Sequence, residues 1–251
     1  MRLKKNEQKI FVKNKYDEKL DGLCSYPKIK KDKYPSIILV HGFYVTKHEG
    51  YFDEITEILN DKDYLVFRFD FSGCGKSEGN FSETSITKLK QDLKIILDYV
   101  ENQEYVDKKN ISIIAQSFGV AITLALKPKV KTLILTSPSY NLRDYKDKFN
   151  FFPKLNVYKR ETTSRGIIKL LPYFFRDLSK YDFLNNIKKI KHPLLIIGAG
   201  NDSKVSINDV KKLFGSANNP KELHIINGAG HSYNNLRIKL FLIIQRFLEK
   251  H

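Results

Sequence analysis

The sequence predicts an α/β protein in which helices flank a largely parallel β-sheet. From residue 36 to the C-terminus, short apolar runs alternate with amphipathic stretches, which is typical of successive βα units. The apolar runs are rich in Ile, Leu and Val, as strands buried on both faces require. With 251 residues, of which 41% are hydrophobic, the chain is long enough to form one large core.

Six apolar runs have the length and composition of buried strands. They are residues 36–42, 64–70, 111–117, 131–137, 193–200 and 221–228. Two weaker runs near the N-terminus, KIFVKNKY and LDGLCSYP, suit a hairpin at the edge of the sheet. Apolar residues at helical spacing predict core-facing helices over 86–100 and 236–247.

One long stretch interrupts this alternation. From Ser139 to about Leu184 the chain is rich in Tyr, Phe, Lys and Asp, shows no clear strand, and is too long for a simple connection. We therefore expect a cap of short helices inserted over residues 139–184, with the core formed by residues 1–138 and 185–251. Residues 165–184 are the best helical candidate within the cap, interrupted at Pro172.

The formal net charge of +16 could in principle attract nucleic acid, anionic membranes or acidic substrates. The lysines are scattered, however. The densest groups, KIKKDK at 28–33 and KKIK at 188–191, precede apolar strands, where solvated loop charges are usual. We therefore do not expect nucleic acid as a partner, and the sequence does not determine the oligomeric state.

The sequence is not typical of a membrane span, a signal peptide or a metal site. It has no run of about 18 apolar residues, and charged residues break up the apolar ones at its start. Cys24 and Cys74 have no partner at CxxC spacing, so they indicate neither a metal knuckle nor a disulfide framework. We expect a cytoplasmic protein with no transmembrane segment, no metal and no cofactor.

Ser117 lies where a predicted strand turns into a predicted helix. It is the central residue of AQSFG at 115–119, between the apolar runs ISIIA and VAITLAL. A nucleophile elbow needs this context, because small residues two positions away on either side let the strand and helix backbones approach closely. The usual pattern is G-x-S-x-G, and alanine replaces the first glycine here. Taken alone, such a serine is also compatible with a simple N-cap.

Of the six histidines, His231 has the best setting for a base that would activate a serine. It stands in GAGHSY at 228–233, a loop of small residues between the last predicted strand and the last predicted helix. Asp202 follows another strand directly, in GAGNDSKV, at the same edge of the sheet. Asp202 alone would be interpreted as a turn or N-cap carboxylate. The order Ser117, Asp202, His231 over three βα loops instead favours a Ser-His-Asp triad.

Two backbone N–H groups are candidates for stabilising an oxyanion. The Phe118 N–H lies at the start of the helix after Ser117, where the helix dipole is positive. In VHGFY at 40–44, Gly42 allows a tight turn that aims the Phe43 N–H into the same site. We expect His41, in this loop, to brace it by hydrogen bonding rather than to act as a base.

The GCGKS sequence at 73–77 fits neither nucleotide-binding pattern to which it is similar. A P-loop would need glycine at position 70, where the chain has Asp70, and G-x-G-x-x-G would need glycine at position 78, where it has Glu78. We expect the glycines to serve a tight loop beside Ser117, and Cys74 in that loop to be structural.

Together these motifs resemble the α/β-hydrolase superfamily: HGF after one strand, DFSGCGKSEG after the next, AQSFG at the elbow, GAGND at the acid and GAGH at the base. Residues 41–79 are similar to the small feruloyl/cinnamoyl esterases and to their serine aminopeptidase-like and monoacylglycerol-lipase-like relatives. The resemblance implies an α/β-hydrolase fold with an eight-stranded, mostly parallel sheet and an inserted cap over the site. It also implies hydrolysis of carboxylic esters through an acyl-enzyme.

The expected function is that of a serine esterase acting on a small-molecule ester. Ser117 would be the nucleophile, His231 the base and Asp202 the acid that orients it, with the Phe43 and Phe118 N–H groups as the oxyanion hole. The aromatic residues of the cap would suit aromatic or short to medium acyl groups, or they only pack the cap onto the sheet. Two alternatives stay open: a peptidase or amidase with the same triad, and a binding protein whose triad is silent.

Overall fold

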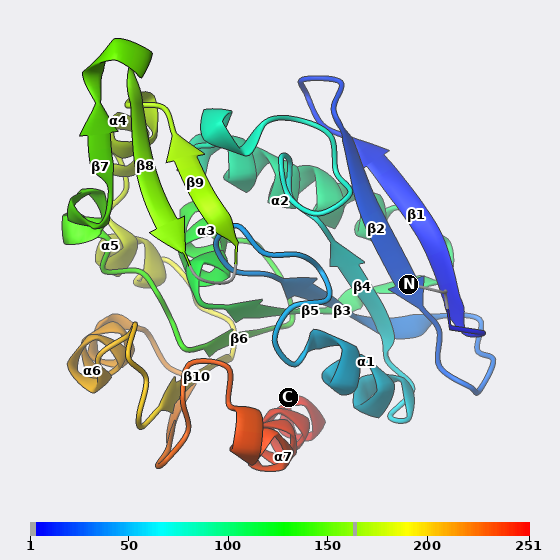
Figure 1. Cartoon of the computed structure of the whole chain (residues 1–251). Coiled ribbons are helices and arrows are strands. Elements are labelled where there is room, and N and C mark those ends of the chain that lie inside the picture. Colours follow the sequence, from blue (N-terminus) through cyan, green and yellow to red (C-terminus); the bar gives the residue numbers. More distant parts are fainter. Residues whose placement is uncertain (1–3, 163–164) are drawn as a thin grey trace.

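An eight-stranded sheet forms the centre of the computed structural model, which describes residues 4–162 and 165–251 (Figure 1). In order across the sheet, the strands are β1 (Glu7–Lys13), β2 (Lys19–Ser25), β4 (Leu65–Phe69), β3 (Tyr34–Val40), β5 (Val106–Gln116), β6 (Thr132–Thr136), β10 (Leu194–Ala199) and β11 (Lys221–Ile226). β2 runs antiparallel to β1 and β4, and every other neighbouring pair is parallel. The predicted mostly parallel sheet and its N-terminal edge hairpin are therefore confirmed.

The six predicted buried strands correspond to β3, β4, β5, β6, β10 and β11. The main difference is in β5, which begins at Val106 rather than at residue 111. Val106 pairs with Tyr34 of β3, and a register shift separates this pair from the next one. The extra half of β5 is polar and partly exposed, so it has no apolar run by which the sequence could mark it.

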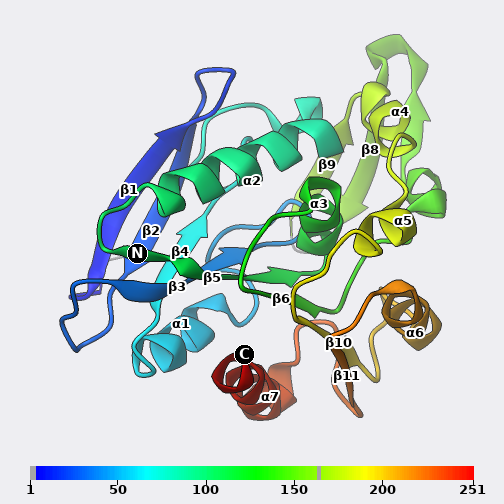
Figure 2. The same ribbon diagram turned by 180° about the vertical axis from the view of Figure 1, so that it is seen from behind.

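Different helices cover the two faces of the sheet, because successive side chains of a strand point to opposite sides. In β10, Leu194 and Ile196 enter one core, whereas Leu195 and Ile197 enter the other. α2 and α3 cover the first face and α1 and α7 the second (Figures 1 and 2). The helices are α1 (Phe52–Asn60), α2 (Ile86–Glu101), α3 (Phe118–Leu126), α4 (Tyr173–Leu178), α5 (Phe183–Ile187), α6 (Ile207–Ser216) and α7 (Arg237–Lys250).

The helices predicted over 86–100 and 236–247 are α2 and α7. α2 begins after Ser85, whose hydroxyl accepts a hydrogen bond from the Lys88 N–H at 3.0 Å and so caps the helix. Among residues 4–162 and 165–251, none of the helices combines the length and the apolar character that crossing a bilayer would require.

The segment 139–184, called the insertion below, contains a small sheet rather than only the short helices that the sequence predicts. β7 (Asn150–Phe152), β8 (Val157–Thr162) and β9 (Gly166–Leu170) form an antiparallel sheet in the order β7-β8-β9. Figure 1 shows this sheet beyond the end of the large one, with α4 beside it. The division of the chain into a core and a cap stays a prediction.

The expectation of a helix over 165–184 is wrong in its first part. Residues 166–170 form β9, in which Ile168 and Leu170 are buried while their neighbours are exposed. An apolar run this short does not by itself separate a strand from a helix. Pro172, expected to interrupt a helix, stands at the N-cap of α4, where its fixed φ is compatible with a helix start.

Hydrogen bonds join the insertion to α2 and to the loop before it. The Leu171 N–H donates to the Ser82 carbonyl oxygen at 2.9 Å. The Asp177 carboxylate accepts from the Thr87 N–H at 2.8 Å and from the Thr87 hydroxyl at 2.7 Å. These contacts fix one side of the insertion beside the first face of the sheet.

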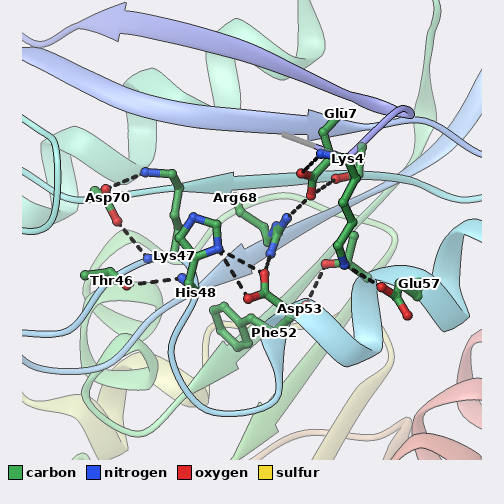
Figure 3. Close-up of polar contacts among 12 residues, drawn as sticks. Lys4, Glu7, Thr46, Lys47, His48, Phe52, Asp53, Glu57, Arg68 and Asp70 are labelled. Carbon is green, nitrogen blue, oxygen red and sulfur yellow. Dashed lines mark hydrogen bonds and ion pairs between the residues drawn. The ribbon is translucent and has the colours of Figure 1, made fainter. Parts of the chain in front are cut away.

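Arg68 is a fully buried cation that ties β1 and α1 to β4 (Figure 3). Its guanidinium donates to Glu7 of β1 at 2.5 Å and also pairs with Asp53 of α1. Burial alone would raise the pKa of Asp53, but the hydrogen bond from His48 and the charge of Arg68 lower it. The charged hydrogen bonds compensate for removing the guanidinium from water.

Replacing Arg68 by methionine should lower the free energy of unfolding by about 3–5 kcal/mol, because the buried Glu7 carboxylate would lose its partner. Urea denaturation followed by circular dichroism measures the change. The matched control is Lys28→Met, which removes an exposed ion pair with Asp61 and should cost less than about 1 kcal/mol. Equal losses in the two variants would contradict the role assigned to Arg68.

Candidate active site

Ser117 occupies a strained turn between β5 and α3. Its φ of 55° and ψ of −123° lie in a region that residues with a side chain rarely adopt. The Ser117 N–H donates to the Thr136 carbonyl oxygen of β6 at 3.0 Å, which ties the turn to the neighbouring strand. The strand-turn-helix setting that the sequence predicts for Ser117 is therefore present.

Close backbone packing around this turn explains its small residues. A Cβ at Gly119 would lie 2.5 Å from the Val40 carbonyl oxygen and 2.6 Å from that of His41. Ala115 is fully buried in β5 and pairs with Val40 of β3. Position 119 thus has room only for glycine, whereas alanine fits at position 115.

The structure brings Ser117, His231 and Asp202 together although they lie in three separate loops. His231 Nε2 is 2.9 Å from Ser117 Oγ, and His231 Nδ1 is 2.8 Å from Asp202 Oδ2. With a proton on Nδ1, the imidazole donates to the carboxylate and accepts from the Ser117 hydroxyl. The three residues follow β5, β10 and β11, whose carboxyl ends lie at one edge of the sheet.

The Asp202 carboxylate is held ionised by donors on both of its oxygens. Oδ1 accepts from the N–H groups of Lys204 and Val205 at 2.8 and 3.1 Å, and Oδ2 faces His231. Burial alone would raise the pKa of Asp202, but the hydrogen bond and charge of His231 and the two backbone N–H groups lower it. Asp202 is therefore suited to fix the tautomer and the orientation of the imidazole.

Tyr233 anchors the loop that carries His231, a role that no sequence motif predicts. Its fully buried hydroxyl donates to the Ile197 carbonyl oxygen and accepts from the Ser137 N–H, both at 2.9 Å. The Ser137 hydroxyl donates to the His231 carbonyl oxygen at 3.1 Å. Tyr233 also has a positive φ of 56°, so a tight turn and a buried hydroxyl together set where His231 lies.

Phe43 and Phe118 both line the cleft beside Ser117. In the part of the chain that the structure describes, the backbone N–H of neither residue donates to a protein oxygen. Phe118 is the first residue of α3, where the dipole of the helix favours negative charge. The backbone of Gly42 lies close to Ser117, since a Cβ at Gly42 would lie 3.3 Å from the Ser117 Cβ. The residue of this loop that has a left-handed backbone conformation is Tyr44.

His41 braces the loop after β3, as the sequence predicts. Its Nδ1 donates to the Gly42 carbonyl oxygen at 2.8 Å, and its Nε2 accepts from the Phe71 N–H at 3.0 Å. Burial lowers the pKa of His41, which keeps the ring neutral and able to play both roles. Both ring nitrogens of His41 are therefore hydrogen-bonded to backbone groups of the two loops that the ring joins.

Lys47 joins the same loop to the GCGKS loop from within the protein (Figure 3). The buried ammonium of Lys47 lies 2.5 Å from the Asp70 carboxylate and 2.7 Å from the Asp21 carboxylate. The backbone N–H of Lys47 also donates to the Asp70 carboxylate, at 2.7 Å. Asp70 also accepts from the Lys76 N–H at 2.9 Å. A Cβ at Gly75 would lie 2.2 Å from the Asp70 carboxylate, so this glycine serves a tight, charged loop.

A cleft of about 130 Å³ opens beside Ser117, lined by both the core and the insertion. Its apolar part includes three rings: the Phe43 centroid is 5.0 Å from that of Phe118 and 5.3 Å from that of Tyr145. Val45 and Ile168 add aliphatic surface. This part of the cleft can hold an apolar or aromatic group next to the Ser117 hydroxyl.

The polar part of the cleft is strongly cationic. Lys148, Arg160, Arg165 and Lys204 line it, and Glu49 is the one carboxylate among the lining residues that the structure describes. Three of these cations come from the insertion, and Lys204 comes from the loop after β10. No sequence motif marks these four residues, because they are far apart in a chain with many lysines.

Neither cysteine has features of a reactive thiol. Cys24 and Cys74 are both buried and unpaired, and burial raises the pKa of the Cys24 thiol to about 12. Within residues 4–162 and 165–251, no cluster of three or more His, Cys, Asp or Glu side chains could hold a metal ion.

Residues 32–169 match the protein family described as "Serine aminopeptidase, S33", which is more than half of the chain. The lysophosphatidylserine lipase ABHD12 of Xenopus tropicalis is 25% identical over 205 residues, which cover 76% of this chain and 49% of that protein. The chain thus spans about half the length of the ABHD12 relatives that it matches.

Solved structures share the fold over nearly the whole chain. Est1E from Butyrivibrio proteoclasticus, solved with bound ferulic acid, has a TM-score of 0.85 and 21% identity, and the match covers 96% of this chain and 98% of that one. The α/β hydrolase GrgF from Penicillium sp. sh18 has a TM-score of 0.79 and 17% identity, with 98% of each chain covered. These likenesses confirm the predicted α/β-hydrolase fold.

Gly119→Ala should lower the free energy of unfolding by about 1–3 kcal/mol or more, because the new methyl group would collide with two backbone carbonyls. The control is Gly215→Ala in α6, where a Cβ meets nothing within 4 Å and the better helix propensity should stabilise by roughly 0.5–1 kcal/mol. Urea denaturation of both variants measures the difference. A tolerated alanine at 119 would disprove the close approach.

The ionised Asp202 should make a pH-dependent contribution to stability. Its folded pKa lies below the value of 3.8 for a free carboxyl, so this contribution is complete above that value and is lost as the pH falls through the folded pKa. The difference in free energy of unfolding between wild type and Asp202→Asn should therefore shrink below pH 3.8. Urea denaturation at a series of pH values tests this, and a difference that does not change with pH would contradict it.

Proposed function

Since this chain belongs to the serine aminopeptidase S33 family within the α/β-hydrolases, we propose that it is a serine hydrolase that cleaves carboxylic esters. The main support is the continuous hydrogen-bonded chain from Asp202 through His231 to Ser117. A serine hydroxyl is a weak nucleophile until a base takes its proton, and this arrangement supplies that base. Ser117 is thus the proposed nucleophile, His231 the base and Asp202 the orienting acid.

In the proposed reaction, His231 Nε2 takes the hydroxyl proton as Ser117 Oγ bonds to the ester carbonyl carbon. The resulting oxyanion accepts from the Phe43 and Phe118 N–H groups. The carbon–oxygen bond to the alcohol then breaks, and the alcohol leaves with the proton from His231. Water, deprotonated by the same imidazole, attacks the acyl-enzyme and releases the acid, which restores the Ser117 hydroxyl.

The insertion, in this proposal, acts as a cap that forms one wall of the cleft. Tyr145, Lys148, Arg160, Arg165 and Ile168 all line the cleft together with Ser117. Both the apolar and the charged sides of the site therefore depend on the insertion. Its residues would select the substrate, whereas the core would carry the chemistry.

Charge in the cleft favours an ester hydrolase over an aminopeptidase. An aminopeptidase must bind the positive α-ammonium of a peptide, and a lining of four cations and one carboxylate repels that group. Two of the similar proteins agree with this choice, since ABHD12 is a lysophosphatidylserine lipase and Est1E binds ferulic acid. The rings of Phe43, Phe118 and Tyr145 would suit aromatic or short to medium acyl groups.

The proposal predicts that the purified protein hydrolyses 4-nitrophenyl esters and that Ser117→Ala lowers kcat by several orders of magnitude. Ser216→Ala is the matched control, since it removes an exposed hydroxyl at the end of α6. Release of 4-nitrophenolate measures both rates.

Two other outcomes would contradict the proposal. Faster cleavage of aminoacyl 4-nitroanilides than of matched esters would favour a peptidase. A folded wild type that cleaves none of these substrates would favour a silent triad on a binding protein.

A further inference from the structure

Four cations converge on the cleft beside Ser117 from separate parts of the chain. Lys148 ends the turn before β7, Arg160 lies in β8, Arg165 lies between β8 and β9, and Lys204 follows β10. Two of the eight arginines in the chain therefore face one small cleft. Like charges repel one another, so placing four cations around one cleft destabilises the folded protein.

One of these cations has a structural partner. The Arg165 guanidinium lies 3.3 Å from the Glu49 carboxylate and donates to the Phe43 carbonyl oxygen at 3.3 Å. Arg165 therefore joins the insertion to the loop that carries the Phe43 N–H. The Glu49 carboxylate partly neutralises its charge.

The other three cations have no such partner. Among the described residues, no carboxylate oxygen lies within 4.0 Å of the cationic nitrogens of Lys148, Arg160 or Lys204. Burial lowers the pKa of Lys204 and the positive charges of Arg165 and Arg160 lower it further, whereas the carboxylates of Asp202 and Glu49 raise it. Lys148, Arg160 and Lys204 line the same cleft of about 130 Å³, so they are placed to act on one ligand, and an anion in the cleft would relieve their repulsion.

Arg160 is the member best suited to fix the orientation of an anion. Its guanidinium carbon lies 6.0 Å from the centroid of the Phe149 ring, so the planar group rests beside an aromatic face in the half-buried strand β8. A guanidinium held in this way presents parallel N–H groups that match a carboxylate or a phosphate. Lys148 and Lys204 carry point charges on flexible stems, so they supply charge rather than direction.

We propose that the substrate is an amphiphilic ester that carries a carboxylate or a phosphate. Arg160 binds this anion with Lys148 and Lys204, while the apolar part of the substrate packs against Phe43 and Phe118. This inference rests on the proposed function of Ser117, and it adds a binding subsite that the reaction itself does not require.

Two pairs of substrates locate the anion. The first pair compares the mono-4-nitrophenyl ester of glutaric acid, which carries a free carboxylate on the acyl side, with 4-nitrophenyl pentanoate. The second compares 1-hexanoylglycerol 3-phosphate, which carries its charge on the alcohol side, with 1-hexanoylglycerol. In at least one pair the anionic member should have a kcat/KM roughly tenfold or more above that of the neutral member. Equal rates, or faster cleavage of the neutral member, in both pairs would overturn the proposal.

Arg160→Gln should lower this preference roughly tenfold to a hundredfold, read as the ratio of kcat/KM for the anionic and neutral members. The matched control is Arg143→Gln, which removes an exposed arginine of the insertion that does not line the cleft and should leave the ratio unchanged. An unchanged ratio in Arg160→Gln, with its circular dichroism spectrum intact, would also overturn the proposal.

A binding measurement separates this inference from the proposed reaction. The Ser117→Ala variant is titrated by calorimetry with 1-hexanoylglycerol 3-phosphate and with 1-hexanoylglycerol, and likewise with monomethyl glutarate, which carries one carboxylate, and with the neutral ester methyl pentanoate. Tighter binding of the anionic member of either pair supports the subsite even if the wild type cleaves no ester. Equal binding within both pairs contradicts the subsite even if the wild type is an active esterase.

Discussion

The positive φ of Ser117 depends on the two parallel strands, β3 and β6, that hold β5 on both sides. A non-glycine residue in such a conformation costs on the order of 1–3 kcal/mol, so the surrounding packing must supply at least that much. β6 does so through the bond from the Ser117 N–H to Thr136, and the end of β3 does so because the carbonyl oxygens of Val40 and of the next residue, His41, approach Gly119 closely. The central sheet thus holds the Ser117 hydroxyl in one position, and His231 and Asp202 are aligned with that hydroxyl.

Charge is used in two different ways in this protein. Arg68 and Lys47 are buried, and each lies between two carboxylates, so they hold strands and loops together. Arg160 and Lys204 lie at the cleft, and no carboxylate is within ion-pair distance of either in the described part of the chain. A buried cation without a partner would be destabilising, whereas a cation in an open cleft stays hydrated until a ligand arrives. This contrast, rather than the net charge of the chain, points to an anionic substrate.

Residues next to strands could be placed from the sequence because a parallel sheet gathers its carboxyl ends at one edge. From the sequence alone, that rule predicts that Ser117, Asp202 and His231 lie at one site. The insertion was harder to predict, since β9 is only five residues long and its apolar residues fit a helix equally well. Tyr233 and Arg160 were missed for another reason: their roles depend on partners that are distant in the sequence, and nothing in their own neighbourhood marks them.

The central claim is that His231 activates the Ser117 hydroxyl for attack on an acyl carbon. A fluorophosphonate probe tests this most directly, because it reacts with activated serines and the modified peptide can be identified by mass spectrometry. We predict one adduct, on Ser117, that is lost on heat denaturation and in the His231→Gln variant. An intact, folded protein that forms no adduct, or forms it at another serine, would contradict the claim.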